Sequence, residues 1–174
     1  MTTTIFVTKQ ETPIGEVVAW RTQQGLVALG FTDQWERLSQ WLRVRFSKAV
    51  ESPDPSNNVR DAITQYFTGN VDAFDALPID PRGTELQQKI WQLLRRVPAG
   101  ETHAYAQLAK RAGTSPRVVG NAMAANPVCL ALPCHRVIRS DGTWQGYAYG
   151  DHRKRWLLDH EAQHAEPQHP EPLR

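Results

Sequence analysis

The chain has 174 residues, 40% of them hydrophobic and 22% charged, with a formal net charge of +2. This composition is that of a globular protein of one or two domains, excludes collagen-like and low-complexity chains, and contains no apolar stretch near the roughly 18 residues that span a bilayer. Residues 1–13 lack the pattern of a secretory signal and two cysteines cannot form a disulfide framework, so we expect a soluble, cytoplasmic protein with no membrane partner.

Residues 1–80 have the pattern of a small sheet with helices. Short runs rich in β-branched and aromatic residues predict an antiparallel sheet. They cover residues 3–8, 15–20 and 25–31. Apolar residues at helical spacing predict a helix from an Asp33 cap to about residue 46. These residues are Trp35, Leu38, Trp41, Leu42 and Val44. A second helix is expected over residues 59–68, followed by a linker over 76–83.

Residues 81–163 have the pattern of a mostly helical part. Thr84 and Gln87 match a capping box at the start of a helix. Two short helices follow, over 105–112 and 116–125, and Ser115 and Pro116 are the expected cap and first residue of the second. This pair predicts a helix-turn-helix, whose second helix normally lies against the duplex. The fold class is therefore α/β, with an N-terminal sheet-and-helix domain and a C-terminal helical domain.

The chain ends in a helix and a tail, and its charge is unevenly distributed. A last helix is expected over residues 152–162, and residues 164–174 are expected to be a flexible tail. Residues 1–80 carry a net charge of −3, whereas residues 81–163 carry +6. A basic segment of this kind is typical of polyanion binding, although an ordinary solvated surface explains the imbalance about as well.

Cys134 is the candidate reactive residue. A cysteine is a strong nucleophile as a thiolate, which needs a base or a positive charge nearby. His135 and Arg136 follow directly, but neighbours on an extended strand point to opposite faces, so His135 needs a turn or a bridging water to act on the thiol. Cys129, inside an apolar run, is expected to be a small buried residue. The spacing of cysteines and histidines does not favour a zinc site, and we expect neither metal nor cofactor.

The segment around Cys134 resembles the active-site segment of the O6-alkylguanine–DNA alkyltransferases. The resemblance covers about residues 82–162, and its motifs occur in the family's order. They are Gly100-Glu101, Tyr105–Ala109, Arg117–Ala122, Asn126-Pro127, Pro133–Ile138, Gly142-Thr143, Gly146–Ala148, Lys154–Leu158 and His160-Glu161. The resemblance implies direct repair of duplex DNA by one irreversible transfer of an alkyl group from guanine O6 to a cysteine, after the base is flipped out of the helix.

The resemblance also implies catalytic roles. Cys134 would accept the alkyl group, and His135 would deprotonate it through a bridging water. Glu161 would orient the imidazole. Asn126 would hold the turn after the helix over residues 116–125, which would be the recognition helix. Tyr147 would donate a hydrogen bond to the guanine as negative charge develops on it.

The remaining implied roles concern DNA and the substrate pocket. Tyr105 would come into steric contact with the 3′ phosphate of the damaged nucleotide. Arg117 would occupy the place in the base stack that the flipped base leaves. The recognition helix would contact DNA through small residues, and larger ones would line the pocket. These are Gly120, Asn121 and Ala122 for DNA, and Val137, Trp144 and Tyr149 for the pocket. The bulk of the two aromatic residues predicts a preference for methyl over benzyl adducts. The expected partner is double-stranded DNA containing O6-alkylguanine, bound by a monomer.

Three other classes of protein compete with this interpretation. A non-catalytic lesion-binding protein of the alkyltransferase-like kind usually has another residue in place of Cys134. A helix-turn-helix transcription regulator needs polar side chains for reading base edges, whereas residues 116–125 are mostly small or apolar. A Cys/His hydrolase needs an oxyanion-binding motif, and no such motif is evident. Adduct preference, repair rate, action on O4-alkylthymine, cooperativity on DNA and the role of the N-terminal domain are left open by the sequence.

Overall fold

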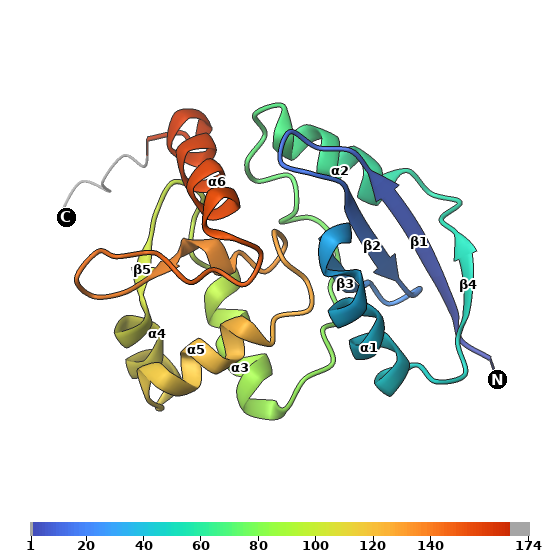
Figure 1. Ribbon diagram of the computed structural model, residues 1–174, viewed down its shortest axis with the longest axis horizontal. Helices are drawn as coiled ribbons and strands as arrows, with labels where there is room; N and C mark the ends of the chain where they lie inside the picture. Colours follow the sequence, from blue (N-terminus) through green and yellow to red (C-terminus); the bar gives the residue numbers. More distant parts are fainter. Residues whose placement is uncertain (1, 168–174) are drawn as a thin grey trace, which may run out of the picture.

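A computed structural model describes residues 2–167, which form a sheet-containing N-terminal part and a largely helical C-terminal part packed side by side (Figure 1). The strands are β1 (Thr4–Gln10), β2 (Val17–Arg21), β3 (Leu26–Phe31), β4 (Val50–Pro53), β5 (His103–Ala104) and β6 (Val137–Ile138). The helices are α1 (Trp35–Arg45), α2 (Asn58–Phe67), α3 (Glu85–Arg95), α4 (Tyr105–Ala112), α5 (Pro116–Ala124) and α6 (Asp151–His164), with 3₁₀ turns η1 (Thr32–Gln34) and η2 (Cys134–Arg136).

The N-terminal sheet is mixed, whereas the sequence predicted an antiparallel one. Its strand order is β3-β2-β1-β4; the first three strands pair antiparallel, and β4 lies parallel to β1. Helix α1 returns the chain before β4, which is how a parallel neighbour is usually reached. β4 was missed because it is a short, largely exposed edge strand that ends in Pro53, a residue tolerated at sheet edges.

Helix α1 differs from its prediction at its start and in the exposure of two of the five apolar residues. Asp33 does not cap it; this residue lies in η1 and forms an ion pair with Arg153 of α6, at 2.8 Å. The buried residues of α1 are Leu38 and Leu42, whereas Trp35 is 39% exposed and Val44 is 72% exposed. The predicted apolar set therefore contains the residues that are buried, Leu38 and Leu42, but its first and last members lie outside the buried face.

One hydrophobic core extends across both parts of the chain. It includes buried side chains from β2 and β3, α2, α3, α4, α5 and α6. The free edge of β3 also forms backbone hydrogen bonds with later segments: Leu26 N–H donates to Pro78 O at 2.9 Å, and Leu29 N–H donates to Pro127 O at 2.8 Å. In return Cys129 N–H donates to Leu29 O at 2.9 Å. The segment that leads to Cys134 therefore rests on the N-terminal sheet.

The C-terminal helices begin as the sequence predicted. Thr84 and Gln87 form both hydrogen bonds of a capping box on α3. Gly113, with φ 71°, ends α4 in the left-handed conformation that favours glycine. Ser115 then caps α5, because its hydroxyl oxygen accepts from Val118 N–H at 3.3 Å. These two helices form the predicted helix-turn-helix.

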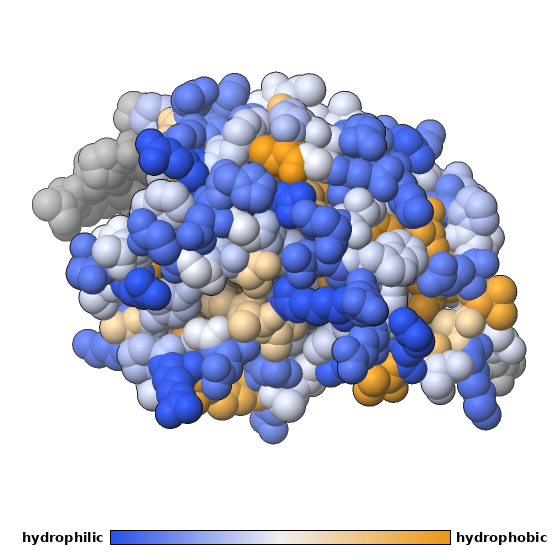
Figure 2. Space-filling view, viewed as in Figure 1, coloured by the Kyte–Doolittle hydropathy of each residue, from blue (hydrophilic) through white to orange (hydrophobic). Residues whose placement is uncertain are grey.

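The last helix is longer than predicted and takes in the start of the expected tail. α6 ends at His164, whose Nδ1 lies 2.8 Å from His160 O. Residues 168–174 of the predicted tail lie outside the described residues. Polar residues cover most of the face seen in Figure 2, with smaller apolar areas between them. Within residues 2–167, no helix combines the length and the apolar character that a bilayer crossing requires.

Replacing Ser115 with alanine should lower the free energy of unfolding by about 1 kcal/mol, because it removes the side-chain acceptor at the start of α5. Urea denaturation measures this change. Ser47→Ala is the matched control, since Ser47 is exposed and has no side-chain hydrogen bond among the described residues. Equal stability of the two variants would contradict the capping role.

Candidate active site

Asn126 fastens the loop that carries Cys134. Its side-chain Nδ2 donates to Leu132 O at 2.8 Å, and its Oδ1 accepts from Val128 N–H at 2.9 Å. Both bonds are buried, and they join the end of α5 to both ends of the apolar run that precedes Cys134. Leu130, inside this run, has φ 70°, which is unusual for a residue other than glycine. The loop is therefore held in one tight, specific conformation.

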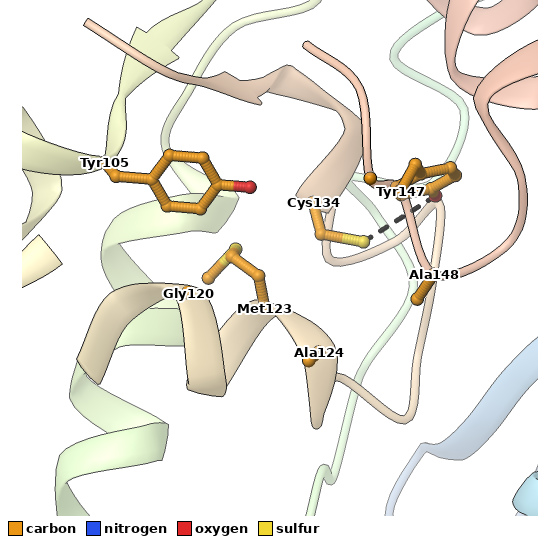
Figure 3. A pocket seen from close by; sticks show the side chains of 8 residues that line it. Tyr105, Gly120, Met123, Ala124, Cys134, Tyr147 and Ala148 are labelled. Carbon is orange, nitrogen blue, oxygen red and sulfur yellow. Dashed lines mark hydrogen bonds between the residues drawn. The ribbon is translucent and has the colours of Figure 1, made fainter. Parts of the chain in front are cut away.

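The thiol of Cys134 lies in the first position of η2 and is 4% exposed. Its Sγ lies 3.7 Å from the hydroxyl oxygen of Tyr147, as the dashed line in Figure 3 marks. Burial raises the pKa of Cys134 above its ordinary value, although hydrogen bonds from Tyr147 and Asn126 and the charges of Lys154 and Arg37 oppose this. Without DNA, the structure thus favours the neutral thiol rather than the thiolate expected from the sequence.

His135, Arg136 and Glu161 form a fully buried polar network behind the thiol. Glu161 Oε1 lies 2.7 Å from His135 Nε2 and 2.8 Å from Arg136 Nη2, while Oε2 accepts from Arg136 Nε at 2.9 Å. Burial by itself would raise the pKa of Glu161, but the charges and hydrogen bonds of His135 and Arg136 bring it far below its usual range. The group is therefore a carboxylate.

The same network determines which nitrogen of His135 carries a proton. A carboxylate only accepts hydrogen bonds, so Nε2 must be the protonated nitrogen that donates to Glu161. Burial lowers the pKa of His135 despite the opposing charge of Glu161, so the ring is neutral near pH 7. Its Nδ1 is buried and has no hydrogen-bond partner among the described residues. The free lone pair on Nδ1 makes the imidazole a competent base.

A small cavity opens directly above the thiol. Figure 3 shows Tyr105 and Cys134 directed toward it, with α5 forming one wall. Its lining residues are Tyr105, Gly120, Met123, Ala124, Cys134, Gly146, Tyr147 and Ala148. The α5 wall consists of small residues apart from Met123, and a Cβ atom added at Gly120 would meet no atom within 4 Å. Met123 is therefore the one bulky side chain that α5 contributes to the lining of this cavity.

A second, more open groove adjoins the cavity and shares three of its residues, Tyr105, Gly120 and Gly146. Arg117 of α5 lines it, together with Arg139 and Gln145 from the segment between β6 and α6. Arg117 and Asn121 are both exposed on α5. The positive charge of this groove and its position beside the helix-turn-helix suit a nucleic-acid backbone.

Four residues assigned to sites from the sequence lie elsewhere. Ala122 is 2% exposed and faces α3, where its carbonyl oxygen accepts from Trp91 Nε1 at 2.9 Å, so it is not a surface residue for DNA. Val137 is fully buried, and its carbonyl oxygen accepts from Lys154 Nζ at 2.6 Å. Neither Val137 nor Trp144 lines the cavity.

Tyr149, the fourth of these residues, turns away from the cavity. It is 2% exposed, and its ring packs against Phe31 of β3 with centroids 5.7 Å apart. Its hydroxyl group lies so close to Gly30 that a Cβ atom there would come within 2.9 Å of it. The prediction that Tyr149 and Trp144 narrow the pocket and select small adducts therefore loses its steric basis.

Sequence reasoning missed several residues that shape the site. Met123 and Ala124 line the cavity, and Arg139 lines the groove. No local signal marked them, because a cavity lining is assembled from segments that lie apart in the chain, here α5 and the segment after β6. Tyr66 of α2 donates to Glu161 at 2.7 Å from a position 95 residues away in the chain.

Comparisons with known proteins agree with this geometry. The family model described as 6-O-methylguanine DNA methyltransferase, DNA binding domain, matches residues 85–163, and the model described as the ribonuclease-like domain matches residues 5–81. The methylated-DNA–protein-cysteine methyltransferase of Shigella flexneri is 38% identical over 160 residues, covering 88% of this chain and 93% of that protein. The Escherichia coli bifunctional transcriptional activator/DNA repair enzyme Ada is 37% identical, covering 88% of this chain but 44% of that protein.

Solved structures give the same result. The crystal structure of Mycobacterium tuberculosis O6-methylguanine methyltransferase has a TM-score of 0.76 and 29% identity, covering 94% of this chain and 96% of that one. The structure of Mycobacterium tuberculosis OGT in complex with DNA has a TM-score of 0.74 and 30% identity, with the same coverage.

Replacing Glu161 with glutamine should lower the free energy of unfolding near pH 7 by about 3 kcal/mol, because it leaves the buried Arg136 charge unpaired. The pKa of Glu161 is lower in the folded protein, so its contribution is complete above an ordinary carboxyl pKa of about 4.3 and is lost as the pH falls further. The variant's stability should therefore depend less on pH in the acid range.

Urea denaturation across this range measures both effects. Glu11→Gln is the control, because Glu11 is exposed and no ion pair involves it among residues 2–167. A Glu161→Gln variant as stable as this control at neutral pH would show that the buried network contributes little to stability.

Proposed function

Because the chain belongs to the family of 6-O-methylguanine DNA methyltransferases, we propose that it repairs O6-alkylguanine in duplex DNA by a single, irreversible transfer of the alkyl group to Cys134. The observation that carries this proposal is the position of the Cys134 thiol, at the floor of a cavity walled by α5 and backed by the His135–Glu161 pair. The family is one of DNA-repair enzymes of the methylated-DNA–protein-cysteine methyltransferase class.

The reaction is a displacement at a saturated carbon, which favours a soft sulfur nucleophile. The thiol proton passes through a bridging water to Nδ1 of His135, and the sulfur electron pair forms the new S–C bond. The C–O6 bond breaks, and its electron pair stays on the guanine, which takes up one proton from water. The imidazolium of His135 then releases the former thiol proton to water, so that His135 is neutral again. Tyr147, whose hydroxyl group lies 3.7 Å from Sγ, is positioned to donate to the guanine as this charge develops.

The raised pKa of the Cys134 thiol is compatible with this chemistry. Burial keeps the free protein in its neutral and less reactive form. When an alkylguanine occupies the cavity, the negative charge of the sulfur can move onto the leaving guanine. Loss of the thiol proton is therefore coupled to the presence of substrate. The product is a thioether that ordinary cellular thiols do not reverse, so each molecule acts once.

The DNA would lie along the helix-turn-helix, with the damaged base flipped through the groove into the cavity. Tyr105 lies at the junction of the two, where it would crowd the 3′ phosphate of the flipped nucleotide. Arg117 projects from the exposed side of α5 and would fill the vacated stack, while Gly120 and Asn121 allow close approach to the groove of the duplex. Cytoplasmic location and a monomeric state remain predictions.

An alternative is that the protein is a regulator like the Ada protein, whose name joins transcriptional activation to DNA repair. The chain matches less than half of that protein. The exposed positions of α5 also offer few side chains that read base edges. Repair is therefore the better-supported proposal.

Incubating the protein with a duplex that contains O6-methylguanine should add one methyl group to Cys134, detected by intact-mass and peptide mass spectrometry. Cys134→Ser should remain unmodified. Cys129→Ala is the control, because Cys129 is also buried but lies outside the cavity lining, and it should still be methylated at Cys134. An unmodified wild-type protein in the presence of excess substrate would leave recognition without repair as the function.

Replacing Arg117 with alanine should slow methyl transfer from duplex DNA by about tenfold, because a stack-filling side chain offsets part of an unstacking cost of a few kcal/mol. Transfer from a single-stranded oligonucleotide should change much less, since little stacking must be broken there. Single-turnover rates on the two substrates measure the difference, with Arg60→Ala on α2 as a surface control. An equal loss on both substrates would contradict the stack-filling role.

A further inference from the structure

The side chain of Tyr66 crosses from the N-terminal part into the proposed active site. Tyr66 lies near the end of α2 and is fully buried. Its hydroxyl group donates to Oε1 of Glu161 at 2.7 Å, the same oxygen atom that accepts from His135 Nε2 at 2.7 Å. The hydroxyl group must be the donor, because the carboxylate has only lone pairs to offer.

We propose that Tyr66 is a positioning residue for alkyl transfer: its hydroxyl group fixes the Glu161 carboxylate and shares the oxygen atom that holds the imidazole of His135. This inference rests on the proposed function. It gives the N-terminal part a direct role in the chemistry, in addition to its packing against the C-terminal part.

The surroundings of Tyr66 keep its hydroxyl group aimed at Glu161. Its ring packs against Phe67 and Phe74, each with centroids 5.2 Å away, and against His160 at 5.4 Å. The backbone carbonyl of Tyr66 also lies 2.7 Å from Nε2 of His160, one residue before Glu161 on α6. Both the ring and the backbone of Tyr66 are thus tied to the turn of α6 that bears the carboxylate.

Sharing one oxygen atom has a chemical consequence for His135. Each additional donor withdraws charge from Oε1, so the carboxylate stabilises a protonated imidazole less strongly. With Tyr66 in place, His135 remains a neutral base to lower pH. Without the hydroxyl group, the carboxylate would favour the imidazolium form, and the base would be protonated at a higher pH.

Several other charged or titratable groups surround this network. Glu161 faces Arg136 from η2 in addition to His135 and Tyr66. The charges of Arg136 and Lys154 act on His135, and Asp75 lies within electrostatic range of Arg136 and Glu161. Cys129 acts on Tyr66, and His160 stacks on its ring. The test must therefore change the Tyr66 hydroxyl group and leave all of these in place.

The test is the pH dependence of the single-turnover methyl-transfer rate on an O6-methylguanine duplex. Tyr66→Phe keeps the ring and removes the hydroxyl group. Its rate at the plateau should fall by about three- to tenfold, and the acid limb of its profile should move up by roughly half a pH unit, because a buried carboxylate loses one of its donors. The matched control is Asp33→Asn, which weakens another contact between the two parts, the ion pair with Arg153. Its acid limb should coincide with that of the wild type.

A second variant should shift the acid limb of the pH–rate profile in the opposite direction. Site-specific replacement of Tyr66 with 3-fluorotyrosine keeps the packing and makes the hydroxyl group a stronger donor, so the acid limb should move to lower pH. If the wild type is methylated and both Tyr66 variants keep its acid limb, Tyr66 has only a structural role and the inference is overturned. If the wild type itself is not methylated, the proposed function fails and the inference fails with it.

Discussion

The buried carboxylate of Glu161 is the common acceptor that organises the polar groups of the site. It is fully buried, and three side chains donate to it: Tyr66, His135 and Arg136. An isolated carboxylate at this depth would be strongly unfavourable, and only this set of donors keeps it ionised. Its charge in turn places the proton of His135 on Nε2 and leaves Nδ1 with a free lone pair.

The N-terminal part supports this arrangement at three separate places. The edge of β3 pairs with residues 127–129 and so holds the start of the active-site loop. Arg153 of α6 donates to Ile14 O at 2.9 Å and pairs with Asp33, which fastens the helix that bears Glu161. Tyr66 reaches the carboxylate itself. The two parts therefore build one site, although every residue that lines the cavity comes from the C-terminal part.

Local signals in the sequence predicted much of this structure, and long-range contacts account for what they missed. The capping residues Thr84 and Ser115 fixed the starts of two helices correctly, because a cap depends on neighbours within one turn. The parallel pairing of β4 and the bond from Tyr66 to Glu161 depend on residues far apart in the chain. Ala122 was misplaced because motif position alone does not say which face of α5 packs against Trp91.

Nitrogen-15 NMR of the imidazole rings observes directly which tautomer His135 adopts. In the free protein near neutral pH, the His135 ring should carry its proton on Nε2, while Nδ1 has the chemical shift of an unprotonated nitrogen. A ring protonated on Nδ1, or on both nitrogens, would contradict the proposed role of His135, because no ring nitrogen would be left to accept the proton of Cys134.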